Sequence, residues 1–260
     1  MDEHDTALDV WQAAIAVALS YGLATFYYAV LIELWPAGSP RAEGITAGLF
    51  AHGTIIAFLM WHGRIGYRRL LHDTRTPLRA LAGALLLPVL LVAAGGALVA
   101  ADVVNVLETL FPMSEGNRAL FASMLDGSPE ALTAALMIAP IAEEMLFRGL
   151  ILRGLLQHYT PGPAIFLSAL IFALAHMNLY QGSVAMLVGL VCGWMYWRTH
   201  SLLPCVLAHL CFNAVATFYD PAPLGEAGSK ILQATASFAG LAAMLLGLAL
   251  LYRILERRES

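Results

Sequence analysis

Three short motifs in this 260-residue chain combine side chains that are suited to acid–base chemistry. Together they supply carboxylates, a guanidinium, two imidazoles and an amide. A carboxylate can take a proton from water, an imidazole can hold that water, and an amide can donate to a developing negative charge. The motifs are Glu143-Glu144-xxx-Arg148, Phe172-xxx-His176 and His209-xxx-Asn213.

The first motif separates its two carboxylates if the segment is helical. Adjacent helical residues point about 100° apart, whereas residues i and i+4 share a face. We therefore expect Glu144 to pair with Arg148 along one face. Glu143 points to another face, that of Phe147, and stays close to a fixed positive charge. Pro140, just before the motif, cannot donate a backbone hydrogen bond and is expected to kink the helix.

The other two motifs also have the spacing of one helical turn, so Phe172 and His176 share a face and His209 and Asn213 can aim at one point. Structural interpretations remain open for each motif alone. The first can be a plain ion pair with Arg148 as a snorkelling anchor, and a histidine within a membrane often bonds a neighbouring helix. The combination of all three motifs favours a functional site.

The segments that carry these motifs are strongly apolar. The chain is 60% hydrophobic and 12% charged, about half the charged fraction of a soluble domain. Its apolar runs of roughly 18 to 25 residues are long enough to cross a bilayer. We predict an all-α, polytopic membrane helix bundle of about eight transmembrane helices. They cover residues 9–35, 44–62, 79–101, 131–156, 162–178, 181–198, 201–218 and 229–252.

The chain shows no linker, so we expect one membrane-embedded domain over 1–260 with the motifs in a core at 131–219. The segment 102–130 is expected to contain a short interfacial helix. Arginines gather on the side that also holds the N-terminus, which predicts cytoplasmic termini. These arginines are Arg64, Arg68, Arg69, Arg75, Arg79, Arg153, Arg198, Arg253, Arg257 and Arg258.

The N-terminal sequence, the net charge and the cysteines give no indication of further partners or of a cleaved signal. The acidic start, Met1 to Asp5, lacks the basic residues of a signal peptide, so we expect the first span to be retained. A net charge of −4 gives no indication of nucleic-acid binding. The three cysteines lie in apolar segments without CxxC spacing and are expected to be structural.

In order and spacing, the three motifs resemble the signature motifs of the CAAX protease and bacteriocin-processing (CPBP, or Abi) family. No signature residue departs from that pattern. The resemblance implies an eight-helix intramembrane endopeptidase acting on a membrane-associated protein or peptide, and we expect it in the bacterial inner membrane. Family members include CAAX endopeptidases that cut prenylated C-termini and bacterial proteins of bacteriocin processing, immunity or protein sorting. The specific substrate is therefore not implied.

Two versions of the chemistry are compatible with these residues. In the favoured, metal-free version, Glu143 is the general base, His176 holds the water, and His209 and Asn213 stabilise the oxyanion. In the alternative, Zn²⁺ is bound by Glu143, His176 and His209, with water as the fourth ligand. HExxH is absent from the chain.

Two non-proteolytic functions also remain open. A non-catalytic immunity or scaffold protein on the same fold would keep its function after loss of Glu143. A proton-coupled transporter would use the intramembrane Glu, His and Arg as an ion path and would show proton-coupled flux in liposomes. The clustering of polar residues in three helices, without an inverted repeat, disfavours the transporter.

Overall fold

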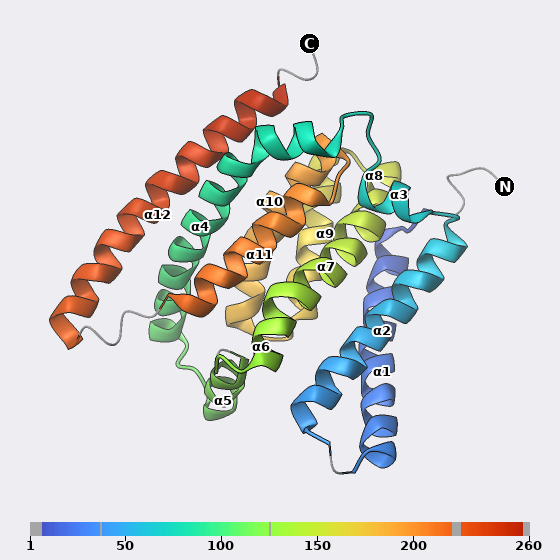
Figure 1. Ribbon diagram of the computed structural model, residues 1–260, viewed down its shortest axis with the longest axis horizontal. Coiled ribbons are helices and arrows are strands. Elements are labelled where there is room, and N and C mark those ends of the chain that lie inside the picture. Colours follow the sequence, from blue (N-terminus) through green and yellow to red (C-terminus); the bar gives the residue numbers. More distant parts are fainter. Residues whose placement is uncertain (1–6, 37, 125, 220–224, 257–260) are drawn as a thin grey trace. The chain divides into compact units, whose positions relative to one another are not determined.

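The computed structural model describes residues 7–36, 38–124, 126–219 and 225–256 (Figure 1). All regular secondary structure in these ranges is helical, which confirms the all-α prediction. The chain divides into two compact units, each built from two segments. The first unit comprises the chain up to Asp73 and Met137–Leu202, and the second comprises Thr74–Leu136 and the chain from Leu203 onward. The single domain over 1–260 stays a prediction.

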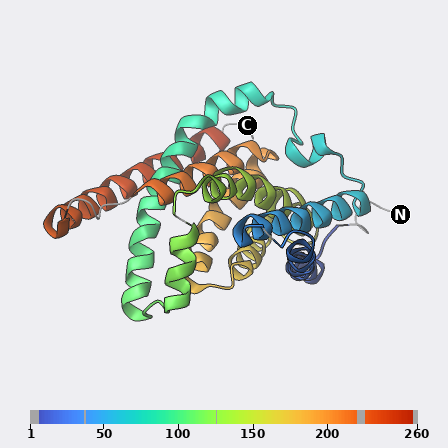
Figure 2. The ribbon, with the colours of Figure 1, turned by 60° about the horizontal axis from the view of Figure 1, so that its bottom comes forward.

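The first unit begins with two long helices, α1 (Val10–Leu34) and α2 (Pro40–His62), which lie side by side (Figures 1 and 2). Asp9 caps α1 in a capping box: its side chain accepts from the Gln12 backbone N–H, and Gln12 reaches back to the Asp9 N–H. Such reciprocal bonds satisfy backbone donors that a helix start leaves unpaired. A short helix, α3 (Tyr67–Leu71), follows α2.

The first motif lies in a long helical segment that is interrupted by two π-helical stretches. The segment runs through α6 (Pro129–Thr133), η2 (Ala134–Ile138), α7 (Ala139–Glu144), η3 (Met145–Leu152) and α8 (Arg153–His158). The π stretch η2 ends two residues before Pro140, and the kink expected at Pro140 stays a prediction. The second π stretch starts directly after Glu144, and π turns within helices are frequent at functional sites.

The remaining helices of the first unit, α9 (Pro161–Ala175) and α10 (Leu179–Thr199), form a closely packed pair. A Cβ atom on Gly189 would lie 2.8 Å from the Ala169 Cβ, so only glycine allows this approach. The sequence predicted that the α9 span continues to residue 178, but the helix ends at Ala175. Met177 there adopts a φ of 48°, which reverses the chain before α10.

The second unit contains α4 (Leu78–Leu110), α5 (Glu115–Met124), α6, α11 (Leu203–Phe218) and α12 (Gly225–Glu256). Helices α4 and α12 lie side by side (Figure 1) and touch at two glycines. A Cβ on Gly95 would lie 2.3 Å from the Gly240 carbonyl oxygen, a distance that no side chain permits. Helix α4 runs well past the predicted end at residue 101. A short helix, α5, lies within 102–130, where the sequence predicted one, and its place at the membrane interface stays a prediction.

Within the part of the chain that the structure describes, five helices are long and apolar enough to cross a bilayer: α1, α2, α4, α10 and α12. Helices α9 and α11 are apolar but shorter. These helices support an integral membrane protein, and the count of eight spans stays a prediction. The orientation is likewise untested. Arg257 and Arg258, on which it partly rests, lie outside the described residues, as does the acidic segment 1–5.

Candidate functional site

Glu144 and Arg148 form an ion pair in the interior of the first unit. The Arg148 Nη1 donates to the Glu144 Oε1 over 2.9 Å, and the side chains are 1% and 0% exposed. This is the pairing that the i, i+4 spacing predicted. Removing a charge from water costs several kcal/mol, which an isolated charge could not recover. The two side chains therefore depend on each other.

The same arginine also covers an aromatic ring of the second motif. The guanidinium carbon of Arg148 lies 4.7 Å from the centre of the Phe172 ring, as in a cation–π contact. Phe147 packs against the same ring at a centroid distance of 4.7 Å. The Ser168 hydroxyl of α9 donates to the Phe147 carbonyl over 3.1 Å, which fixes α9 to η3.

His176 caps the C-terminal end of α9, beside Phe172. Its ring stands edge-on to the Phe172 ring with centroids 5.0 Å apart, and its Nδ1 lies 2.9 Å from the Phe172 carbonyl oxygen. A carbonyl oxygen can only accept, so Nδ1 carries the proton. In the neutral ring the other nitrogen, Nε2, is then an acceptor. Nε2 is therefore the nitrogen of His176 that can accept a hydrogen bond from another group.

These contacts form a continuous series, here called the motif stack, of Glu144, Arg148, Phe172 and His176. It joins the first and second motifs within one unit. Glu143 is half-buried next to it.

A residue of α1 reaches the same region. The Tyr21 hydroxyl donates to the carbonyl of Ala175, next to His176. Glu143 acts electrostatically on that hydroxyl. Sequence reasoning missed Tyr21 because a tyrosine within an apolar span carries no distinctive spacing.

The third motif belongs to α11 in the second unit. His209 is buried and Asn213 is half-buried. The Asn213 amide donates to the Ala135 carbonyl over 2.8 Å, so it is tied to the π stretch that precedes the first motif. An asparagine amide has two N–H groups, so a second one is left for another acceptor. The catalytic roles of all six predicted residues stay predictions.

The family model described as Type II CAAX prenyl endopeptidase Rce1-like matches residues 128–215. This segment, here called the Rce1-like region, is similar to that family. It includes all three motifs and confirms the resemblance to the CAAX protease family. Neither the curated proteins nor the solved structures contain a match to the chain.

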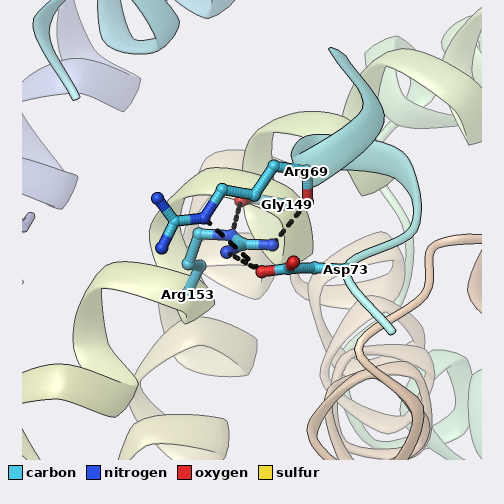
Figure 3. A network of polar contacts seen from close by, with 4 residues as sticks. All are labelled: Arg69, Asp73, Gly149 and Arg153. Atoms are coloured by element: carbon cyan, nitrogen blue, oxygen red, sulfur yellow. Dashed lines mark hydrogen bonds and ion pairs between the residues drawn. The ribbon is translucent and has the colours of Figure 1, made fainter. Parts of the chain in front are cut away.

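A second polar cluster, here called the Asp73 network, links the Rce1-like region to α3 (Figure 3). Arg153 donates to the Asp73 carboxylate over 2.8 Å, to the Gly149 carbonyl over 3.2 Å and to the Arg69 carbonyl over 2.6 Å. Partial burial raises the pKa of Asp73, but the hydrogen bond and charge of Arg153, with Arg69, outweigh it and lower the pKa.

The Asp73 network is separate from the predicted site residues. The pocket beside it is lined by His62, Arg69, Leu150, Arg153 and others, and by none of the six residues singled out from the motifs. In the sequence the arginines of this network indicated only the orientation, because Asp73 and Arg153 are 80 residues apart along the chain.

Proposed function

We propose that this protein is an intramembrane endopeptidase that hydrolyses a peptide bond of a membrane-associated protein or peptide, using water activated by Glu143. The observation that carries the proposal is the motif stack within the Rce1-like region. In the stack, Glu144 forms an ion pair with Arg148, and the Nδ1 of His176 donates a hydrogen bond to a backbone carbonyl. Glu143 and the Nε2 of His176 are then the groups assigned to chemistry.

In the first step, Glu143 takes a proton from water while the water oxygen attacks the carbonyl carbon of the substrate. His176 accepts a hydrogen bond from this water at Nε2 and so orients it. The product of this step is a tetrahedral oxyanion and a protonated Glu143.

In the second step, the carbon–nitrogen bond breaks and Glu143 returns its proton to the leaving amine. We assign the stabilisation of the oxyanion to His209 and Asn213, since each can donate a hydrogen bond. A donor of this kind typically contributes about 3 kcal/mol to the transition state. The support for this assignment is the residue types and the resemblance to the family.

Glu144 and Arg148 are assigned a positioning role. Because both charges are buried and neutralise each other, neither is suited to proton exchange with substrate. Arg148 instead holds the Phe172 ring, against which His176 packs.

A zinc-dependent version remains the alternative. A neutral imidazole that donates from Nδ1 to a carbonyl is also typical of a metal-bound histidine, so His176 suits either version. In this version Glu143, His176 and His209, the ligands taken from the motifs, would hold Zn²⁺, which would supply a more acidic water. The described residues contain no group of three His, Cys, Asp or Glu side chains arranged to hold a metal ion. Metal analysis of the purified protein separates the versions. Stoichiometric zinc that is lost together with activity on chelation would overturn the metal-free one.

The family description makes a prenylated C-terminal peptide the first substrate class to try. The protein itself is proposed to lie in a bilayer with both of its termini in the cytoplasm. The broader test does not assume a substrate. Membrane-protein termini are compared by mass spectrometry between cells that express the wild type, Glu143→Gln or Glu33→Gln at equal protein level. Glu33 is an exposed carboxylate at the end of α1 and serves as the control.

We expect a set of termini to disappear in Glu143→Gln and to persist in Glu33→Gln. These termini would identify the substrate class. If all termini persist in Glu143→Gln and the cellular phenotype is retained, the protease proposal fails. A non-catalytic immunity or scaffold function would then be the better explanation.

A further inference from the structure

Helix α9 ends at the site, and its last carbonyls need hydrogen-bond donors from elsewhere. The final four carbonyls of a helix have no partner within the helix, and an unpaired one is costly in an apolar environment. Their donors here are the His176 Nδ1 for Phe172, the His176 N–H for Ala173, the Met177 N–H for Leu174 and the Tyr21 hydroxyl for Ala175. Three of these donors are local, and the fourth comes from α1.

Tyr21 therefore bonds the last residue of α9, which directly precedes His176. Tyr21 is 41% exposed, so it is not a core residue of the first unit. The hydroxyl also lies within electrostatic reach of Glu143. Tyr21 is thus connected to both motifs of the first unit.

We propose that Tyr21 is a positioning residue of the peptidase: its hydroxyl fixes the end of α9 and so places the His176 ring for the attacking water. This inference rests on the proposed function. It adds α1, which lies outside the Rce1-like region, to the parts that organise the site. Misplacement of a catalytic group by about 1 Å can cost a large factor in rate, so one hydroxyl on a distant helix can matter.

The chain offers a matched control on the same helix. The Tyr27 hydroxyl shares a hydrogen bond of 3.0 Å with the Thr54 hydroxyl of α2. Tyr27→Phe and Tyr21→Phe each remove one hydroxyl and one hydrogen bond between helices. They differ in that Tyr21 is bonded next to His176.

The test uses the purified full chain in lipid nanodiscs. The probe is a synthetic peptide that covers a cleavage site found in the comparison of termini. We expect Tyr21→Phe to lower kcat about tenfold with little change in KM, since a misplaced ring slows the reaction without removing a substrate contact. Tyr27→Phe should keep both constants. Each rate is divided by the concentration of protein that is folded and monodisperse.

Glu143→Gln is measured in parallel to separate the two proposals. If Glu143→Gln keeps its full kcat, the proposed function fails whatever Tyr21 does. If Glu143→Gln is inactive and the two tyrosine variants have the same kcat, only the Tyr21 proposal fails. If Tyr21→Phe does not fold while Tyr27→Phe does, the Tyr21 hydroxyl serves the stability of the fold. This result would also overturn the proposal.

Discussion

Two arginines of the Rce1-like region show how burial changes the energetic contribution of an ion pair. Arg148 lies 2.9 Å from Glu144, and Arg153 lies 2.8 Å from Asp73. The first pair is 1% and 0% exposed, whereas the second is 12% and 41% exposed. Two pairs with nearly the same distance therefore differ in energy, because water screens the exposed pair much more than the buried one.

The two pairs also differ in what they hold. Arg148 pairs with a residue one turn away and covers the Phe172 ring, against which His176 packs. Arg153 pairs with a residue that is distant in sequence and fastens α3 to the helical segment. We infer that the buried pair serves the site and that the Asp73 network serves the surrounding structure.

The largest effect is expected from breaking the buried pair. Glu144→Gln removes the carboxylate that neutralises the buried Arg148 charge and should lower the free energy of unfolding by about 3–5 kcal/mol. The double variant Glu144→Gln/Arg148→Met should recover much of that loss but remain poorly active, because Phe172 loses its cation. Denaturation in detergent and a cleavage assay measure the two effects. A fully active double variant would contradict the positioning role.

A smaller effect is expected from the ring in the middle of the motif stack. Phe172→Leu removes the cation–π contact and the edge-on contact with His176, which together correspond to about 2 kcal/mol. Activity should fall as well. The control is Phe166→Leu on the same helix, where the ring is 50% exposed. Equal melting temperatures and equal rates for the two variants would contradict the stack as an organising element.

The Asp73 network should respond more weakly. Arg153→Gln loses an ion pair with a partly exposed partner and should cost about 1 kcal/mol of stability, with cleavage largely retained. Arg68→Gln, an exposed neighbour on α3, should leave the melting temperature unchanged. A loss of cleavage in Arg153→Gln comparable to that in Glu144→Gln would remove the distinction between the two pairs.

The smallest effect concerns pH. The pKa of Asp73 is lowered in the folded state, so its ionised form contributes stability above its unfolded pKa of about 3.8. That contribution is lost as the pH falls through the folded pKa. The stability difference between the wild type and Asp73→Asn should therefore be present at neutral pH and shrink below about pH 4. A difference that does not change with pH would exclude this linkage.

The sequence predicted the features that depend on local periodicity. Apolar runs indicated the helices, and the i, i+4 spacing identified the Glu144–Arg148 pair and the shared face of Phe172 and His176. The end of α9 at Ala175 escaped prediction because it is followed by a chain reversal at Met177, where a non-glycine residue takes a positive φ.

Contacts between distant segments were also beyond sequence reasoning. Neither the bond from Tyr21 to Ala175 nor the pairing of Asp73 with Arg153 has a spacing signature. The Asn213 amide was expected to serve an oxyanion, and its bond to the Ala135 carbonyl depends on tertiary packing within the second unit.

The central claim is that Glu143 activates water, and purified protein in nanodiscs tests it most directly. The rates at which wild type, Glu143→Gln and the control Glu33→Gln cleave the same peptide are compared at matched melting temperature. A general base typically contributes about 10²–10⁴-fold to the rate, so Glu143→Gln should lose at least about 100-fold while Glu33→Gln keeps the wild-type rate. A Glu143→Gln protein that is folded and cleaves the peptide as fast as the wild type would contradict the claim.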